Sequence, residues 1–210
     1  MCKELKDMTL EELWELFPII LKEHNYEYKN WYEIEKEKIV NASYCKKVSR
    51  INHIGSSVVP GLLSKPTIDI LLEIKTETDI NHVINELTND GWGLMSSQVA
   101  PYLNYSFNKG YTKYGFAEKV YHLHVRLRGD WKELYFRDYL IEFPEIAEEY
   151  SRLKLKIFKD FEHDRDGYTN AKTDFISYHT DKARIKYYNR YKDSDHNKKS
   201  INFVDKTKER

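Results

Sequence analysis

Cysteine, glycine and proline are scarce in this sequence of 210 residues, which contains 2, 8 and 5 of them, and 34 basic residues balance 34 acidic ones. Two cysteines, Cys2 and Cys45, are too few for a disulfide framework and form no metal-binding spacing, which fits a reducing compartment. Few glycines and prolines argue against disorder except at the ends. The zero net charge removes the basic character expected of a protein that binds long nucleic acid.

Long apolar runs are also missing. No stretch approaches the ~20 residues that a membrane-spanning helix requires, and the opening segment "MCKELKDMTLEELWEL" is too charged for a signal peptide. We therefore expect a cytoplasmic protein with no membrane partner. Because 40% of the residues are hydrophobic, the chain can form a sizeable core. We expect one domain over residues 1–191 and a polar tail over 192–210, and the sequence leaves the oligomeric state open.

Helical spacing of apolar residues predicts N-terminal helices over residues 9–42. The first begins with a capping-box pattern, Thr9 followed by Glu12, and the second is expected over 28–42. Another helix is expected in "TDINHVINELTNDG", with a threonine as its N-cap and Gly91 at its end.

Between these helices and the C-terminal part, short β-rich runs predict a mixed sheet over residues 47–128. The runs are "VSRINHI", "TIDILLEI", "APYLNYSFNKG" and "EKVYHLHVRLRG". Residues 130–191 then return to helical spacing, and three helices are expected in "DWKELYFRDYLIEF", "PEIAEEYSRLKLKIFKDFE" and "GYTNAKTDFISYHTDKARIKYYNRY". The predicted fold class is α+β, a mixed sheet with flanking helices and a C-terminal helical segment.

One acidic residue, Asp69, interrupts the apolar run "TIDILLEI". On a strand, Asp69, Leu71 and Glu73 share one face, and the isoleucine and leucine residues between them share the other. A carboxylate there is costly unless it is paired, hydrogen-bonded or bound to a cation. A salt bridge to Lys65 or a cap at the strand end is the structural alternative to a functional role.

A possible phosphate-binding turn lies a short distance before Asp69, at Gly55, Ser56 and Ser57. A strand that ends in Gly-Ser and enters a turn leaves backbone N–H groups that can bind a phosphate. Gly-Ser turns are common, so the pattern gains its meaning from the spacing between Gly55 and Asp69.

Strand, Gly-Ser, about a dozen residues and a strand with Asp resemble the pattern of the polymerase-β-like nucleotidyltransferase superfamily. The string "HIGSSVVPGLLSKPTIDILLEI" resembles the GrpB family within it. The segments "FNKGY", "GFAEKVYHLHVRLRGD", "LYFRDYL", "PEIAEEYSRLK" and "RDGYTNAKTDFI" also resemble GrpB segments in the same order, so the likeness covers roughly residues 9–190.

In that superfamily the Gly-Ser turn holds the phosphates of a nucleotide, while three acids bind two divalent ions. The resemblance therefore implies that Asp69 is the first of these acids. This sequence has Leu71 where the second acid belongs. Glu73 lies on the same face but about 7 Å further along the strand, so ordinary catalysis with two Mg²⁺ ions is in doubt.

Two histidines, His122 and His124, stand two apart in "YHLHV" and would face the same way on a strand. With Asp69 from a neighbouring strand they could form a metal site, and imidazole with carboxylate suits Zn²⁺, Mn²⁺ or Fe²⁺ better than Mg²⁺. Hydrogen bonds to other strands, or an anion site, are the alternatives. His53 is expected to be an ordinary residue at a strand end.

Basic residues near these motifs could hold phosphate oxygens. Lys65 and Arg126 are the main candidates, with Lys109 and Arg128 beside them. Ion pairs between helices are the expected role of the charged residues in "RD" at 137–138 and in "DGYTNAK" at 166–172, with Arg137 as the exception that could serve the site.

The sequence thus predicts a protein that binds a nucleotide or a small phosphorylated ligand. It could transfer a nucleotidyl group with a divalent ion, Mg²⁺, Mn²⁺ or Zn²⁺, at Asp69. The alternative is a non-catalytic module that senses a ligand or binds a partner after loss of the metal cluster, and Leu71 favours it.

Overall fold

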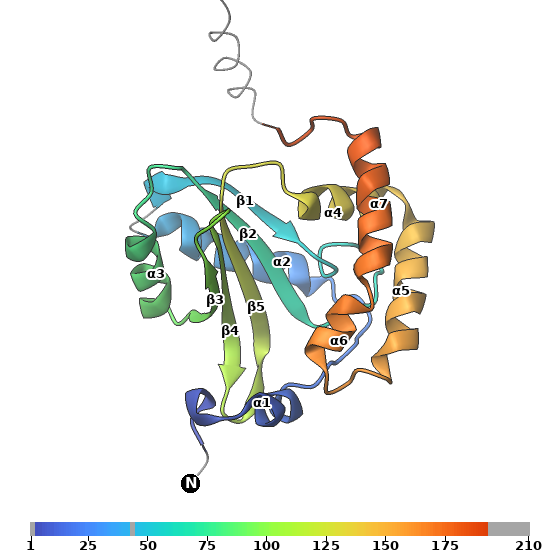
Figure 1. The fold of residues 1–210 in the computed structure, drawn as a ribbon, viewed down its shortest axis with the longest axis horizontal. Coiled ribbons are helices and arrows are strands. Elements are labelled where there is room, and N and C mark those ends of the chain that lie inside the picture. Colours follow the sequence, from blue (N-terminus) through green and yellow to red (C-terminus); the bar gives the residue numbers. More distant parts are fainter. Residues whose placement is uncertain (1–2, 43–44, 193–210) are drawn as a thin grey trace, which may run out of the picture.

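A five-stranded mixed sheet forms the centre of the protein (Figure 1). The computed structural model describes residues 3–42 and 45–192, and every structural statement below concerns these residues. The strands are β1 Val48–Ile54, β2 Thr67–Ile74, β3 Gly93–Gln98, β4 Asn104–Thr112 and β5 Gly115–Leu127. The helices are η1 Leu5–Asp7, α1 Leu10–Leu16, α2 Glu27–Asn41, η2 Cys45–Lys47, α3 Ile80–Asn89, α4 Lys132–Glu142, α5 Pro144–Phe158, α6 Arg165–Asn170 and α7 Thr173–Lys186.

The strand order is β1-β2-β5-β4-β3. Only β2 and β5 run parallel, and the other neighbours are antiparallel, so the predicted mixed sheet with flanking helices is confirmed. Strand β3 was not predicted. All of its side chains are exposed, and "GLMSSQ" has neither alternation nor β-branched residues, which are the two signals of a strand.

Local side-chain hydrogen bonds cap the N-termini of α1 and α3. In α1 the backbone N–H of Glu12 donates to Oγ1 of Thr9 and the N–H of Thr9 donates to Oε2 of Glu12, so the predicted capping box is confirmed. The threonine cap predicted for α3 is wrong. The side chain of Asp79 caps this helix by accepting from the N–H of Asn81, because Asp79 is the residue that immediately precedes the first turn.

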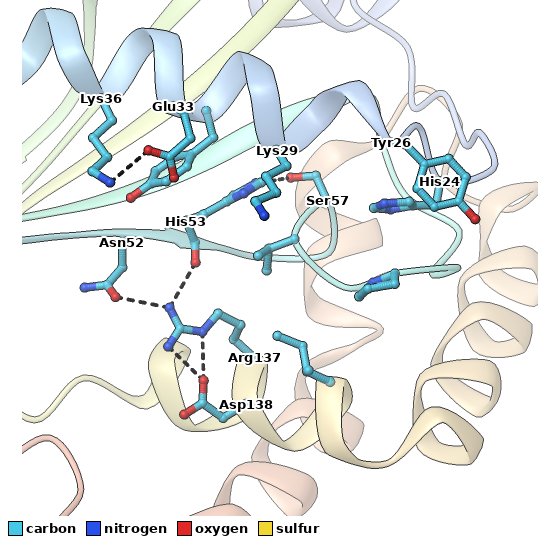
Figure 2. A pocket seen from close by; sticks show the side chains of 14 residues that line it. His24, Tyr26, Lys29, Glu33, Lys36, Asn52, His53, Ser57, Arg137 and Asp138 are labelled. Atoms are coloured by element: carbon cyan, nitrogen blue, oxygen red, sulfur yellow. Dashed lines mark hydrogen bonds and ion pairs between the residues drawn. The ribbon is translucent and has the colours of Figure 1, made fainter.

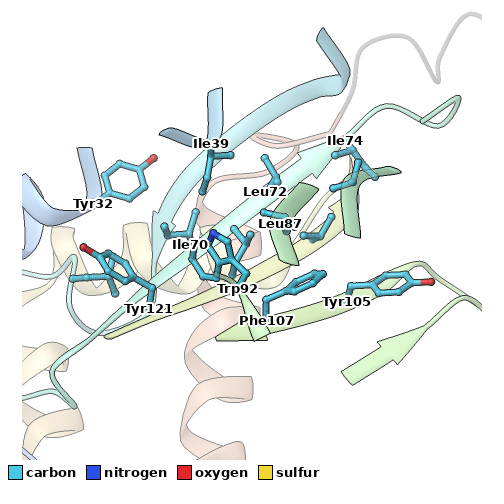
Figure 3. Packing of buried hydrophobic residues seen from close by; sticks show 14 of the residues in the cluster. Tyr32, Ile39, Ile70, Leu72, Ile74, Leu87, Trp92, Tyr105, Phe107 and Tyr121 are labelled. Carbon is cyan, nitrogen blue, oxygen red and sulfur yellow. The ribbon is translucent and has the colours of Figure 1, made fainter. Parts of the chain in front are cut away.

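The main core lies between one face of the sheet and helices α2 and α3 (Figure 3). Side chains at alternate strand positions point into it, as the period of two requires. They are Ile68, Ile70, Leu72 and Ile74 of β2 and Tyr121, Leu123 and Val125 of β5, packed against Tyr28, Tyr32 and Ile39 of α2 and Val83 and Leu87 of α3. The residues between them, including Asp69, therefore face the other side of the sheet.

Helices α4 to α7 form a group to one side of the sheet (Figure 1). Leu134 of α4 packs on Ile54 and Leu71, so this second face is apolar where α4 covers it. The last predicted helix is two helices, α6 and α7, because the chain leaves the helical pattern at 171–172. Tyr168 in α6 is thereby buried against Ile19 and Ile157.

The division into one domain over 1–191 stays a prediction, and the predicted tail lies outside the described residues except for Lys192. In the ranges that the structure covers, no helix has the length and apolar character needed to cross a membrane.

Candidate functional site

The turn after β1 lies directly against Asp69. Strand β1 ends at Ile54, which pairs with Asp69 across the sheet, and Gly55 then turns the chain with a φ of +72°. A Cβ atom on Gly55 would lie 2.4 Å from Oδ2 of Asp69. The two motif residues are therefore in contact, and the contact requires a residue without a side chain.

Two histidines from the neighbouring strand β5 face the carboxylate of Asp69. Nδ1 of His122 lies 3.3 Å and Nε2 of His124 lies 3.9 Å from Oδ1 of Asp69. Burial opposes ionisation of Asp69, but the hydrogen bonds from both histidines outweigh it and hold the pKa of Asp69 below its usual range. Asp69 is therefore a carboxylate at neutral pH. The expected placement of Asp69, His122 and His124 on one face of adjacent strands is confirmed.

A chain of hydrogen bonds sets the tautomer of His122. Arg165 donates from Nη2 to the hydroxyl oxygen of Tyr111 at 2.9 Å, and that hydroxyl lies 2.8 Å from Nε2 of His122. Because Arg165 only donates, the proton of Tyr111 can go to Nε2, which leaves the proton of His122 on Nδ1, facing Asp69. Burial lowers the pKa of His122 and raises the pKa of Tyr111, so both groups are neutral. His122 thus acts as a hydrogen-bond donor to Asp69.

Three lysines gather on the same side of the turn, and we call Lys65, Lys154 and Lys172 the lysine cluster. Lys154 of α5 donates from Nζ to Oγ of Ser56 at 3.3 Å and to the carbonyl of Leu63. Nζ of Lys172 lies 4.0 Å and Nζ of Lys65 lies 5.9 Å from the centre of the Tyr168 ring. One aromatic ring and one turn therefore bring three positive charges together.

Burial and neighbouring positive charges lower the pKa of each lysine in the cluster. Burial first, and then Lys172 and Lys65, lower the pKa of Lys154 to about 7. Burial and Lys65 lower the pKa of Lys172 to about 7, and burial and Arg165 lower the pKa of Lys65 to about 8. Asp69 acts in the opposite sense on Lys65 and Lys172. Among the residues that the structure describes, neither these lysines nor Arg165 forms an ion pair with a carboxylate.

Ser57, the third member of the predicted phosphate turn, points away from the lysine cluster. Its Oγ lies 3.0 Å from Nε2 of His53, and both side chains are buried. Burial lowers the pKa of His53 to about 4, so its ring is neutral. His53 stacks on Tyr32 of α2, which agrees with the ordinary strand-end role expected for it.

The comparisons with known proteins identify the family. The sequence profile described as "GrpB protein" matches residues 18–182. The chain belongs to the GrpB family. The glutamate-rich protein GrpB of Alkalihalophilus pseudofirmus is 30% identical over 161 residues, which are 75% of this chain and 91% of that protein. The protein YqkA of Bacillus subtilis is 26% identical over 156 residues, which are 73% of this chain and 43% of YqkA.

A solved structure of a GrpB protein supports the fold. The crystal structure of the conserved protein GrpB from Enterococcus faecalis matches with a TM-score of 0.70 and 24% identity, over 80% of this chain and 99% of that chain. The structure of Cid1 in complex with its short product ApU overlaps 63% of this chain, with a TM-score of 0.44 and 13% identity. The resemblance to GrpB found in the sequence is thus confirmed.

The two positions on the Asp69 face of β2, Leu71 and Glu73, supply no second metal-binding acid beside Asp69 in this GrpB chain. Leu71 is fully buried against Ile54 and Leu134. Glu73 is fully buried too, but its carboxylate accepts from Nη2 of Arg50 at 2.7 Å and from the N–H of Gly129 at 3.0 Å. Glu73 therefore cannot replace the missing second acid, because Arg50 and a backbone donor already use it. No group of three or more His, Cys, Asp or Glu within the described ranges is arranged to hold a metal.

The remaining predicted cations lie elsewhere. Arg126 faces the same side as His122, but it is about 13 Å along the strand, and its Nη1 pairs with Oε1 of Glu133 at 3.0 Å. Lys109 is on β4 and pairs with Glu35 and Asp90.

Two arginines considered with them have other contacts. Arg128 donates to Oγ of Ser49 at 3.4 Å. Arg137 pairs with Asp138 and donates to the carbonyl of His53 at 3.1 Å, so it ties α4 to β1.

Several residues of the site were missed in the sequence. Lys154 and Arg165 lie in helical segments that read as ordinary amphipathic surface, and Tyr111 has no motif of its own. Lys172 was expected in an ion pair between helices, but its ammonium group lies over the ring of Tyr168. Only the packing of α5, α6 and α7 beside the sheet brings these groups to Asp69.

Proposed function

We propose that this GrpB-family chain binds a nucleotide or another small phosphorylated ligand, with the phosphate held between the Ser56 turn and the lysine cluster. The observation that carries the proposal is the excess of positive charge. Three lysines and Arg165 lie close together, and the carboxylate of Asp69 acts on Lys65 and Lys172, although the whole chain has zero net charge. Buried charges are costly unless something pairs with them, and an anionic ligand would supply that pairing.

Each group would contribute differently to binding of the phosphate. Lys154 is held in place by the carbonyl of Leu63, so its ammonium and the hydroxyl of Ser56 present donors with little loss of side-chain entropy. Lys172 and Lys65 add charge from the other side. Asp69 is kept ionised by His122, and it would repel a phosphate that came too close.

A divalent ion could resolve that repulsion. Mg²⁺ is commonly held by one or two carboxylates together with the phosphates of a substrate, and Asp69 would be its protein ligand here, where it would neutralise phosphate charge. Nucleotidyl transfer with two ions would need a second carboxylate beside Asp69. Leu71 has none, and the carboxylate of Glu73 is already bound to Arg50. The proposal is therefore for binding, with transfer through one ion at Asp69 as its extension and a non-catalytic module as the alternative.

Isothermal titration calorimetry with ATP, UTP and inorganic tripolyphosphate, each with and without Mg²⁺, tests the proposal. We expect tripolyphosphate to compete with the nucleotides. Lys172→Gln should weaken binding about tenfold or more, since hydrogen bonds to charged groups contribute about 1.5–3 kcal/mol. Lys156→Gln is the matched control, because Lys156 is an exposed lysine on α5.

Failure of all three anions to bind, or equal binding by wild type and Lys172→Gln, would overturn the proposal. Release of pyrophosphate from a bound nucleotide would favour transfer. Binding without any release would favour the non-catalytic module.

A further inference from the structure

A cavity opens on the other side of the Gly55 turn from the lysine cluster, at the edge of the sheet beside β1 (Figure 2). We call it the edge cavity. It has a volume of about 510 Å³, within the range of small-molecule sites, and lies between α2, α4 and the turn. Adjacent serines separate it from the lysine cluster: Oγ of Ser56 contacts Lys154, whereas Oγ of Ser57 contacts His53 in the wall of the edge cavity.

Much of the wall is apolar or aromatic. The turn contributes Val58 and Pro60, α4 contributes Ile141, and Tyr26 and Tyr32 come from the start and middle of the α2 region. These side chains would bury the body of an apolar or aromatic molecule, and the hydrophobic effect favours that burial.

The charged side chains in the wall have a net charge of one positive unit. Lys36 pairs with Glu33 at 2.9 Å, and Arg137 pairs with Asp138 at 2.7 Å. Lys29 forms no ion pair with any described residue. Asp138 also pairs with Arg190, which lies outside the cavity wall, so the wall itself has an excess of one positive charge, at Lys29.

The neutral polar groups favour an oxygen anion as well. Burial lowers the pKa of His53 to about 4 and also lowers the pKa of His24, so neither ring adds charge at neutral pH. Oδ1 of Asn52 accepts from Arg137, while its Nδ2 is buried without a partner among the described residues. Nδ2 of Asn52 is thus a donor that a ligand oxygen could satisfy.

We propose that the edge cavity is a second ligand site, for a small molecule that joins an apolar or aromatic body to one carboxylate. A single carboxylate matches the single excess charge and the amide donor of Asn52. The fork of Arg137 is already used by Asp138, Asn52 and the carbonyl of His53, so the wall has no further cation to balance a phosphate dianion. The site is independent of the phosphate site proposed above.

Binding of 4-phenylbutyrate, compared with its neutral amide and with 4-phenylbutylamine, tests the inference by calorimetry and by backbone NMR shifts in the turn. We expect the acid to bind at millimolar concentration or better and about tenfold more tightly than the amide. Lys29→Gln should remove that difference, and Ile141→Trp should weaken the acid and the amide alike by filling the cavity. The controls are Lys75→Gln and Ile185→Trp, since both residues are exposed and lie outside the cavity.

Absence of binding by the acid at millimolar concentration overturns the inference, as does equal or tighter binding of the amine. Binding of the acid to Ile141→Trp as tightly as to the wild type also overturns the inference. Loss of 4-phenylbutyrate binding in Lys172→Gln would place the acid at the lysine cluster instead. That outcome would reject the edge cavity as its site and leave the phosphate proposal standing.

Discussion

A Cβ atom on Gly55 would lie 2.4 Å from Oδ2 of Asp69, closer than two non-bonded atoms approach. The φ of Gly55 is +72°, which L-residues adopt at a cost of about 1–2 kcal/mol. Gly55→Ala therefore combines backbone strain with a clash against a carboxylate that β2 and His122 hold in place. We expect it to lower the free energy of unfolding by about 2–4 kcal/mol in urea denaturation.

Gly61→Ala is the matched control for this change. Gly61 has a φ of +73°, but a Cβ there meets nothing within 4 Å, so only the strain of about 1–2 kcal/mol applies. Equal losses in the two variants would show that Asp69 yields to the added methyl group. A smaller loss in Gly55→Ala when combined with Asp69→Ala would confirm that the two residues interact.

Glu73 offers a different prediction, because it is buried with Arg50 as its partner. Glu73→Gln leaves the guanidinium of Arg50 without its counter-charge, and removal of one partner of a buried pair typically costs about 3–5 kcal/mol. We expect a loss in that range by urea denaturation, with phosphate affinity unchanged. Glu77→Gln, at an exposed position, should change stability by less than about 0.5 kcal/mol. If Glu73→Gln kept its stability and lost Mg²⁺-dependent binding, Glu73 would be a metal ligand after all.

Local patterns in the sequence were enough to predict β1, β2 and the turn at Gly55 and Ser56. The apolar run around Asp69 and the Gly-Ser turn are only a dozen residues apart, so short-range geometry brings them together. Alternation in "YHLHV" placed both histidines on one face, and parallel pairing of β2 with β5 put them beside Asp69.

The remaining parts of the site and of the fold depend on long-range packing, which local sequence patterns do not reveal. Lys154 lies in α5 and Lys172 in the turn between α6 and α7, and periodicity alone does not say which part of a helical segment packs beside a distant turn. Strand β3 has no buried face, so it carries none of the alternation by which strands are recognised. Arg126 shares a face with His122, but a shared face does not give distance along a strand.

Asp69→Asn tests whether a metal ion binds with the phosphate. Without ligand, the variant loses the carboxylate that, among the described residues, offsets Lys65 and Lys172, so we expect it to lose about 1–3 kcal/mol of stability. Without metal, its affinity for tripolyphosphate should rise because a like charge is gone. The extra affinity that Mg²⁺ gives the wild type should disappear. Calorimetry measures both, with Asp181→Asn on α7 as the exposed control, and an unchanged Mg²⁺ effect in Asp69→Asn would exclude Asp69 as a ligand.

Ligation by His122 or His124 has its own test in the pH dependence of Mn²⁺ or Zn²⁺ binding. A histidine must lose its proton to bind a metal, and burial holds the pKa of His122 below its usual range, so affinity that depends on this ring should fall only as the pH drops below that lowered pKa. The hydrogen bonds of Tyr111 assign the proton of His122 to Nδ1, so a metal bound there would also require the other tautomer. A metal affinity that stays flat from neutral pH down to the acid limit of folding would contradict ligation by His122.

The lysine cluster predicts that stability rises with pH in the absence of ligand. The pKa values of Lys154 and Lys172 are lowered to about 7 and that of Lys65 to about 8, whereas an unfolded lysine has a pKa of 10.5. Above pH 7 the unfolded chain therefore binds more protons than the folded one, so the contribution of these groups to the unfolding free energy increases with pH up to about 10. Below pH 7 both states are protonated and the repulsion is felt in full. Lys172→Gln should be more stable than the wild type at neutral pH, and the difference should shrink by about 1–2 kcal/mol toward pH 9.

Ligand binding should reverse this proton balance. A phosphate beside Lys154 and Lys172 favours their charged forms and raises their pKa values, so the complex takes up protons at pH 7 to 8 and affinity falls as the pH rises. The terminal phosphate has a second pKa of about 6, so it is already ionised above pH 7 and its charge changes little there. Ionisation of the phosphate makes the ligand more negative as the pH rises, which would increase the affinity and so could not explain a fall. Calorimetry of tripolyphosphate binding in buffers with different ionisation enthalpies measures the uptake. Lys156→Gln should keep it and Lys172→Gln should reduce it. An affinity that rises from pH 7 to 9 with no proton uptake would mean that the phosphate does not bind at these lysines.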